Sequence, residues 1–484
     1  MTNRELYHVM ANLWSAVSGQ SPESAPLSVL TVERERGHLA GHHPVEAAAT
    51  ATIATALFSG IALDGARGKA LPTVSVSQRH VAAAMHSGSV FRWNGRPLGF
   101  DFAPLSRFWE VADGWVRTHA NYPWHRRALL RVLDVATESE VDVRKAMQRW
   151  PAEVLEAAVW EAGGIATAMR SPDEWSIHPQ GIAVAAEPLV DRANVGRSAP
   201  RSWTPATLPA EGLRVLDLTR VIAGPVCTRY LAALGASVIR IDPPRWPDLP
   251  LGLPADTLLG KQSSAMDFTT VDGRATLDRL LGEADIVVLG YRPGSLDRFG
   301  LTPESLSERF PGLVIIMLSA WGYHGPWSSR RGFDSVVQSA TGIGWIEGGS
   351  TGQPGSLPCQ LLDHGTGYLA AAAALDGMRE QRTQGGTPIR RLSLARTAQW
   401  LLHLPQDSPP ATAENLNGSE DWVVELQDVH GTQQALLPVG RWNGQQLQWP
   451  KPAAHYASDR PEWLEPRMGP IQTADNGGIR GSNS

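Results

Sequence analysis

The stretch VLDLTRVIAGPVCTRYLAALGASVIRID, residues 215–242, joins a β-branched run, a glycine-containing turn, a helical run and a second apolar run that ends in an acid. Two parallel strands need a crossover connection, which is usually a helix. The stretch therefore predicts a strand–helix–strand unit of a parallel sheet. Its turn, AGP, lacks the G-x-G-x-x-G pattern of dinucleotide-binding proteins, and Pro225 has no N–H to offer a phosphate, which argues against NAD binding.

The same alternation of short apolar runs and helical stretches continues from residue 212 to residue 393 and is typical of an α/β domain with a doubly wound parallel sheet. The predicted strands are 214–218, 237–242, 265–268, 285–289, 313–319 and 389–393, and the predicted helices are 224–234, 272–283, 302–309, 334–341 and 366–380. We predict that this domain spans residues 212–407.

The rest of the chain has a different pattern. Residues 1–185 contain an alanine-rich helix at 46–62, a strand at 72–77 and a mixed helical region. Residues 186–211 are rich in Pro, Ser and Arg and predict a linker. Residues 408–484 are predicted to hold a closing segment and a disordered end, since they have little periodicity and finish in NGGIRGSNS.

An internal repeat relates the two parts of the chain. Residues 44–80 and residues 361–397 both run from an acid through a small-residue helix and a Gly/Pro loop to a short strand. In this alignment Glu46 lies opposite Asp363. Two alanine-rich helix–loop–strand units can also look alike by chance.

Composition excludes several classes of partner. The 484 residues carry a formal charge of -5, which argues against nucleic acid and anionic membrane surfaces. The two cysteines, Cys227 and Cys359, are far apart and favour a reducing cytoplasm over a disulfide framework. We expect no signal peptide and no membrane span, because the N-terminus is polar and no apolar run reaches about 18 residues.

Four motifs resemble the class III CoA-transferase (CaiB/BaiF) family in order and spacing. They are VLDLTRVIAGPVCTRYLAALGASVIRIDPP, ADIVVLGYRPGSLDRFGL, LSAWGYHGPWSSRRGFDSVVQSATG and LLDHGTGYLAAAAAL. The resemblance implies a Rossmann-like large domain, a second, smaller α+β domain, and a homodimer whose subunits interlock like rings. It also implies acyl-CoA and a carboxylic acid as the small-molecule partners, with coenzyme A as a substrate and no metal.

The first half resembles the later portion of the same family, through VSVSQRHVAAAM, DGWVRTHANYPWHRRALLRVL and RSPDEWSIHPQGIAVAAEPLV. The chain thus resembles the rear part of one family unit followed by the front part of another. This order leaves open whether the first half completes a site in its own chain or in a partner, and a heteromer stays possible.

The family resemblance assigns Asp363 as the nucleophile that forms an aspartyl anhydride and then an aspartyl-CoA thioester, and Asp334 as a second acid beside it. The alternative is a purely structural role for Asp363, in which its carboxylate stabilises the N-terminus of a helix. Phe333 stands where the racemase branch of the fold has a histidine, which favours a transferase. His364 or His324 could replace that histidine and keep an α-methylacyl-CoA racemase-like isomerase open.

The resemblance also gives a set of expected coenzyme A contacts, because a diphosphate and a ribose phosphate require basic partners. They are Val221, Ala223, Arg245, Lys261, Tyr291, Arg292, Arg298 and Arg331. The histidines of GHLAGHHP, residues 37–44, have no further ligand cluster to support a metal site, and Cys359 is expected to be a small buried residue.

The sequence therefore predicts a CoA-transferase that moves CoA from an acyl-CoA to a free carboxylic acid. A non-catalytic or partner-dependent acyl-CoA-binding subunit and a racemase-like isomerase are the alternatives. The acyl group is not identified by the sequence.

Overall fold

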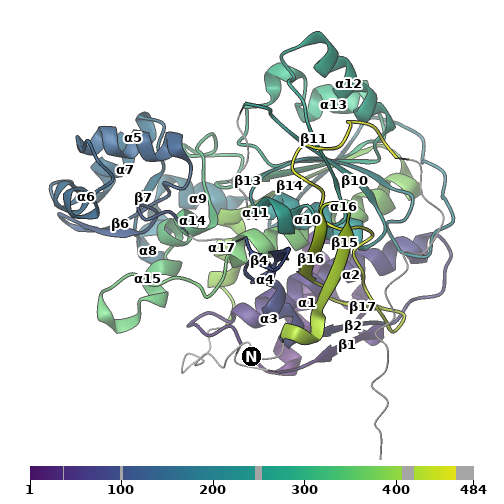
Figure 1. The fold of residues 1–484 in the computed structure, drawn as a ribbon. Coiled ribbons are helices and arrows are strands. Elements are labelled where there is room, and N and C mark those ends of the chain that lie inside the picture. Colours follow the sequence, from purple (N-terminus) through teal and green to yellow (C-terminus); the bar gives the residue numbers. More distant parts are fainter. Residues whose placement is uncertain (36–37, 99–101, 246–252, 406–418, 465–484) are drawn as a thin grey trace, which may run out of the picture.

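A seven-stranded sheet lies at the centre of the computed structural model, which describes residues 1–35, 38–98, 102–245, 253–405 and 419–464 (Figure 1). Its strand order is β11-β10-β9-β12-β13-β14-β8, and all neighbours are parallel except β8, which pairs antiparallel with β14. The strands are β9 (Arg214–Leu218), β10 (Ser237–Asp242), β11 (Gln262–Ala265), β12 (Ile286–Leu289), β13 (Val314–Ser319), β14 (Thr387–Ser393) and β8 (Asp191–Val195). The predicted α/β class and parallel sheet are confirmed.

One predicted strand is misplaced. The sequence pattern predicted a strand at 265–268, whereas β11 ends at Ala265. Asp267 instead begins a turn, in which its carboxylate accepts the Thr269 N–H at 2.9 Å, and Thr270 caps the next helix. Side-chain capping of this kind competes with strand pairing and stops the strand early.

The connections between these strands are helical. They include α10 (Ala223–Ala233), α11 (Leu253–Thr257), α12 (Val271–Glu283), α13 (Pro303–Arg309), α14 (Asp334–Thr341), α15 (Ile343–Glu347) and α16 (Leu361–Gln384). Helix α17 (Leu394–Leu402) follows the last strand, β14. Helix α16 begins at Leu361, before the predicted start at 366, because tertiary packing outweighs the low helix propensity of its glycines. A Cβ on Gly367 would lie 2.5 Å from the Ala223 carbonyl oxygen, so this glycine lets α10 and α16 approach closely.

The internal repeat is present in the order of elements. In the first copy α2 (Val45–Ala66) leads to β2 (Val74–Ser77) and α3 (Gln78–Ala84), as α16 leads to β14 and α17 in the second. Glu46 and Asp363 both lie in the first turn of their helices. Helices α2 and α16 pack along each other, and α1 (Asn3–Ser18) covers α2.

Helix α2 is the one helix among the described residues that is long and apolar enough to cross a membrane. It is mostly buried inside the protein, in the same hydrophobic core as α16. A buried core helix passes such a length and composition test without spanning a bilayer.

A smaller lobe comes from the first half and lies to one side of the main sheet, at the left of Figure 1. It has its own hydrophobic core and an antiparallel sheet in the order β5-β6-β7. Its elements are β5 (Phe108–Val111), β6 (Gly114–Thr118), α5 (Pro123–Leu133), α6 (Glu140–Met147), α7 (Ala152–Glu161) and β7 (Ala166–Ala168). Helices α8 (Pro172–Ile177) and α9 (Pro179–Ala186) follow, and then the chain enters β8.

Residues 186–211, predicted to be a linker, thus contribute a strand to the central sheet. Asn194 of β8 donates to Glu380 of α16 at 2.9 Å, and the Arg201 N–H donates to the Gln381 side chain at 3.1 Å. Part of this segment is therefore held against the sheet, unlike a free linker. The division of the chain into domains stays a prediction.

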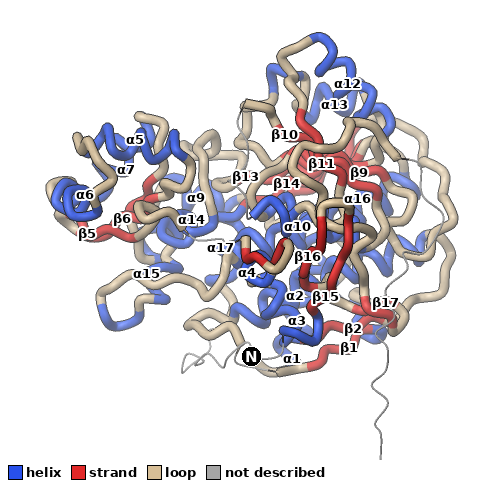
Figure 2. The backbone as a smooth tube through the Cα atoms, viewed as in Figure 1, coloured by secondary structure: helices blue, strands red, loops and turns tan. Residues whose placement is uncertain are grey.

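Strands after residue 419 pair with strands of the first half (Figure 2). One sheet joins β15 (Val423–Asp428) and β16 (Gly431–Leu436) to β3 (Arg92–Trp93) and β4 (Arg96–Pro97), which follow α4 (Ser87–Val90). Another joins β17 (Arg441–Trp442) and β18 (Gln445–Gln446) to β2 and β1 (Leu30–Glu33).

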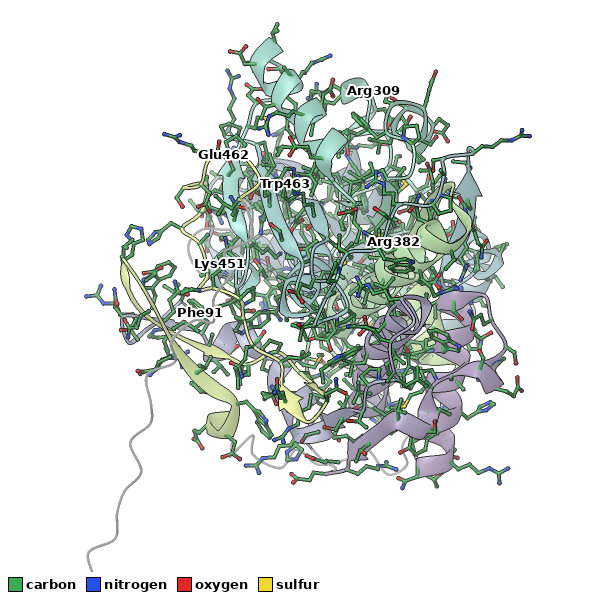
Figure 3. The ribbon with its side chains drawn as sticks, turned by 90° about the vertical axis from the view of Figure 1, so that its right-hand side faces the viewer. Phe91, Arg309, Arg382, Lys451, Glu462 and Trp463 are labelled. Atoms are coloured by element: carbon green, nitrogen blue, oxygen red, sulfur yellow. The ribbon has the colours of Figure 1, made fainter. Side chains whose placement is uncertain are left out.

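The chain then runs along the β11 edge of the central sheet, where Lys451, Glu462 and Trp463 are seen in Figure 3. The Glu462 carbonyl accepts from Gln262 at 3.1 Å, and the Asp459 N–H donates to Ser263 at 2.7 Å. This segment covers an otherwise unpaired strand edge. The predicted disordered end, which finishes in NGGIRGSNS, lies outside the described residues.

Candidate active site

A cavity of about 700 Å³ opens at the carboxyl ends of the central strands. The turn after β9 lines it with Arg220, Val221, Ala223 and Gly224, and the turn after β12 lines it with Gly290, Tyr291, Arg292, Ser295 and Arg298. The end of β13 adds residues 318–320. The strand order reverses between β9 and β12. In open parallel sheets this is where ligands bind, because the two connections leave in opposite directions and open a crevice.

Asp363 lines this cavity from the first turn of α16, and its side chain is only 6% exposed. Its backbone N–H donates to Asp334 Oδ2 at 2.9 Å. Asp334 is fully buried as the first residue of α14, and its other oxygen accepts from Gln338. The structure thus brings together the two acids that the sequence singled out.

The two carboxyl groups perturb each other. Burial, and then the charge of Asp334, hold the pKa of Asp363 well above its ordinary value. Burial raises the pKa of Asp334 to about 6, although the Asp363 N–H and Gln338 favour its charged form. Two buried acids this close do not ionise independently, so the pair holds a proton up to higher pH than an isolated aspartate.

The turn after β9 shapes another part of the cavity wall. Val221 has a φ of 67°, a left-handed conformation that a β-branched residue adopts only under strain. A Cβ on Gly224 would lie 2.2 Å from the Thr219 side chain, so only glycine fits this bend. Ala223 and Gly224 begin α10 at the cavity, and the N-cap residue, Ile222, has an apolar side chain that makes no capping hydrogen bond. Its N–H groups and helix dipole favour an anion there.

Arginines surround the mouth of the cavity. The expected contacts Arg292, Arg298 and Arg331 line it together with Val221, Ala223 and Tyr291. Arg220 and Arg330, which no sequence motif had indicated as contacts, line it too. Guanidinium groups in this number favour a phosphorylated ligand.

Arg245 is the expected contact that lies in a neighbouring cavity. It is exposed and lines a space of about 380 Å³, whose lining includes Arg220, Tyr291 and Arg298 from the wall of the first cavity. The remaining lining is largely apolar, with Ile241 and Phe268 among it. The two cavities therefore meet along one row of side chains.

Lys261 was expected to contact CoA, but it lines neither of these two cavities. It is fully buried, and its ammonium lies 2.9 Å from Asp217 Oδ2 and 2.6 Å from Thr228 Oγ1. A buried ammonium paired in this way has no surface left for a phosphate. It holds Asp217, which in turn accepts the Thr219 N–H at 3.0 Å and fixes the turn after β9.

Aromatic residues of the small lobe complete the wall of the cavity, and they were not among the predicted site residues. Tyr122, Trp124 and His125 line the same cavity as Asp363. They lie in the motif DGWVRTHANYPWHRR, whose dense aromatic and basic residues were the available signal. The first half therefore completes the cavity within the same chain.

The histidines near Phe333 are poor bases. His119 stacks on Phe333 with ring centroids 3.7 Å apart, and burial lowers its pKa well below the ordinary value. Burial, Arg331 and Arg220 lower the pKa of His125 to about 3. The two expected substitutes, His364 and His324, are not among the residues that line this cavity.

The remaining candidates have structural partners. His43 Nδ1 lies 2.6 Å from Glu347 Oε1, within hydrogen-bond distance. The described residues hold no group of three or more His, Cys, Asp or Glu that fits a metal ion. Cys359 and Cys227 are buried free thiols, and burial raises the pKa of both.

Parts of this chain are similar to known proteins. Residues 210–465 match the model of CoA-transferase family III. An acyl-CoA transferase from Gibberella moniliformis is 30% identical over 302 residues, which are 58% of this chain and 53% of that protein. Human succinyl-CoA:glutarate CoA-transferase is 31% identical over 252 residues, 49% of this chain and 58% of that one.

Among solved structures, a CaiB/BaiF family protein from Brucella suis matches with 25% identity and a TM-score of 0.36, covering 46% of this chain and 65% of that one. The chain spans a little over half the length of the two transferases named above.

Proposed function

The chain belongs to CoA-transferase family III, and on that premise we propose that it transfers CoA from an acyl-CoA to a free carboxylic acid through Asp363. The observation that carries the proposal is the place of Asp363, a buried acid at the wall of an arginine-lined cavity. A second buried acid, Asp334, accepts the backbone N–H of Asp363. If Asp363 only capped a helix, a second negative charge beside it would not stabilise the protein further.

The first half-reaction forms a mixed anhydride. A carboxylate oxygen of Asp363 attacks the thioester carbonyl, the C–S bond breaks, and CoA leaves as its thiolate. The thiolate then attacks the Asp363 carbonyl carbon of the anhydride, which releases the donor acid as a carboxylate and leaves an aspartyl-CoA thioester. No proton or oxidant enters either step, so the charges balance.

The second half-reaction reverses this order with the acceptor. The acceptor carboxylate attacks the aspartyl thioester to give a new anhydride and CoA thiolate, and the thiolate attacks the acceptor's carbonyl carbon. The new acyl-CoA leaves and Asp363 returns to its carboxylate. Covalent storage of CoA on the enzyme divides the exchange into steps with activated carbonyls.

Residues around Asp363 support these steps. The open N-terminus of α10 offers N–H groups to an oxyanion or to the departing thiolate. Arg292, Arg298 and Arg331 suit the phosphates of CoA, and Arg245 with the apolar 380 Å³ cavity suits its adenosine end. Tyr122 and Trp124 restrict water, which would hydrolyse the anhydride.

The proposal extends to features of the fold that follow from family resemblance. We infer that the parallel sheet is a Rossmann-like core, that the 105–168 lobe acts as the smaller domain, and that two chains interlock as a homodimer. Two buried free thiols are consistent with a cytoplasmic setting.

The low pKa of the histidine at the cavity argues against the racemase alternative. Removing an α-proton requires a base whose pKa is near the working pH. His125 lines the cavity, but its pKa is about 3, and Phe333 occupies the place of a catalytic histidine. A racemase would exchange the α-hydrogen of its substrate with solvent, and we expect no such exchange in deuterated buffer.

Trapping experiments test the covalent role of Asp363. The purified chain is incubated with a panel of acyl-CoA donors, treated with hydroxylamine and measured by intact-mass spectrometry. We expect a hydroxamate mapped to Asp363 that is absent from Asp363→Asn. Glu46→Gln changes the matching acid of the first repeat and is the control that should keep the adduct.

The alternatives give different outcomes in the same experiment. No adduct from any donor, although CoA binds, would refute a self-sufficient transferase. Adduct formation only after adding a second protein would instead support a partner-dependent subunit.

A further inference from the structure

A histidine of the small lobe lies in the wall of the cavity that holds Asp363. His125, in the first turn of α5, is 3% exposed and lines this cavity. No described residue forms a hydrogen bond with either of its ring nitrogens. Buried polar groups are normally paired, so a hydrogen-bond partner for His125 is expected from a molecule in the cavity.

Packing alone does not explain a histidine at this position. The ring of His125 packs edge-on against three aromatic rings, with centroid distances of 5.5 Å to Tyr122, 5.8 Å to Trp124 and 6.2 Å to Phe333. Such edge-to-face contacts hold the ring in place. Phenylalanine would make the same contacts without the cost of burying two polar nitrogens.

Phe333 connects this ring to the proposed reaction centre. It lines the same cavity and directly precedes Asp334, which accepts the Asp363 N–H at 2.9 Å. A short series of contacts and one peptide bond thus leads from His125 to the backbone of Asp363. The two ends of this series, His125 and Asp363, both lie in the wall of one cavity.

The ring of His125 is uncharged near pH 7. The titratable and charged groups around it are Arg331, Arg220 and His119, and burial followed by the two arginines lowers the pKa of His125 to about 3. A neutral imidazole keeps one N–H and can stabilise negative charge that forms on a carbonyl oxygen. The two guanidinium groups favour negative charge in the same region.

We propose that His125 is a catalytic residue, whose ring N–H donates a hydrogen bond to the acyl carbonyl oxygen when Asp363 attacks. The inference rests on the proposed function, since it needs the reacting carbonyl at Asp363. The attack moves the π electrons of the carbonyl onto its oxygen, and the hydrogen bond holds this charge without transfer of the proton. When the C–S bond breaks, the electrons return and the carbonyl forms again.

The variant His125→Phe tests the donor, because it keeps an aromatic ring for packing and removes the N–H. The measurement is the rate of Asp363 labelling in a single turnover, over a range of donor concentrations. We expect the rate at saturating donor to fall by about 100-fold or more, as for the loss of one oxyanion donor. The donor concentration for half-maximal rate should change little.

The pH dependence adds a readout that a packing defect would not produce. Because the ring of His125 does not titrate near neutral pH, the His125→Phe variant should lower the whole pH–rate profile and leave its acid limb in place. A shifted acid limb would contradict the role of His125 as a neutral donor.

A second pair of variants serves in case His125→Phe does not fold. His125→Gln and His125→Met are nearly isosteric, but only glutamine has an N–H donor. Asp363 should therefore be labelled faster in His125→Gln than in His125→Met. His119→Phe is the matched control, since His119 is also buried and stacks on Phe333 but does not line the cavity. It should leave the rate nearly unchanged.

The outcomes separate this inference from the proposed function. If Asp363 is labelled as fast in His125→Phe and His125→Met as in the parent protein, the donor role is refuted while the transferase stands. Equal losses in His125→Gln and His125→Met, or a loss only in the half-saturating donor concentration, would refute it too. If no donor labels Asp363 in the parent protein, the proposed function itself fails.

Discussion

At the scale of single residues, the pairing of Asp363 with Asp334 determines the pH at which the nucleophile is available. Asp363 must be ionised to attack, and its pKa lies well above the ordinary value because of burial and the charge of Asp334. The rate of anhydride formation should therefore rise with pH as Asp363 loses its proton.

The substitution Asp334→Asn should move the acid limb of this pH–rate profile to lower pH. It removes the negative charge that raises the pKa of Asp363, while its amide oxygen can still accept the Asp363 N–H. The measurement is single-turnover acylation from pH 4 to pH 9. Asp173→Asn, an exposed acid in α8, is the control. An unchanged or upward-shifted limb would contradict the electrostatic link between the two acids.

At the scale of an element, the ion pair between Lys261 and Asp217 fixes the turn from β9 into α10. Both side chains are fully buried, and the ammonium also donates to the Pro225 carbonyl at 3.0 Å. The pair links the end of β9 to the first turn of α10 and so holds the cavity wall at Val221.

Lys261→Met should lower the free energy of unfolding by about 3–5 kcal/mol, because it leaves the Asp217 carboxylate buried without its cation. Urea unfolding followed by circular dichroism gives this value. The double variant Lys261→Met with Asp217→Asn should recover part of the loss. A single variant as stable as the parent protein would contradict the assignment of Lys261 to a structural role.

This pair also marks the limit of what the sequence could predict at this scale. A basic residue at a matching position does not reveal whether its side chain points into a cavity or into the core, so Lys261 was expected to bind CoA. Arg331 and Arg292, which were also expected to contact CoA, do line the cavity, but their contact with CoA stays a prediction. The periodicity of residues 212–393 fixed the strands closely, except where Asp267 and Thr270 formed a side-chain-capped turn instead of a strand.

At the scale of the whole molecule, one chain provides both sides of the cavity. Tyr122, Trp124 and His125 come from the first half, and Asp363 comes from the second. The motifs of the sequence indicated two halves. They did not predict where the first half packs, because its position depends on contacts between residues far apart in sequence. The interlocked homodimer stays a prediction.

Specific activity should therefore not fall on dilution, both for an interlocked dimer that stays together and for a single chain that works alone. Sedimentation velocity gives the oligomeric state at each concentration, and CoA exchange is assayed in the same samples. Activity that falls in proportion to the dimer fraction would show that the second chain contributes to the site.

The packing of α2 against α16 has a consequence for the order of synthesis. Helix α2 is apolar enough to resemble a membrane span, yet its main partner begins only at Leu361. At the usual 5–20 residues per second, the ribosome takes roughly 15–60 s to make the roughly 300 residues between them. During that time the nascent chain presents an apolar helix that α1 covers only in part, so we expect a ribosome-associated chaperone to bind residues 45–66 until α16 emerges.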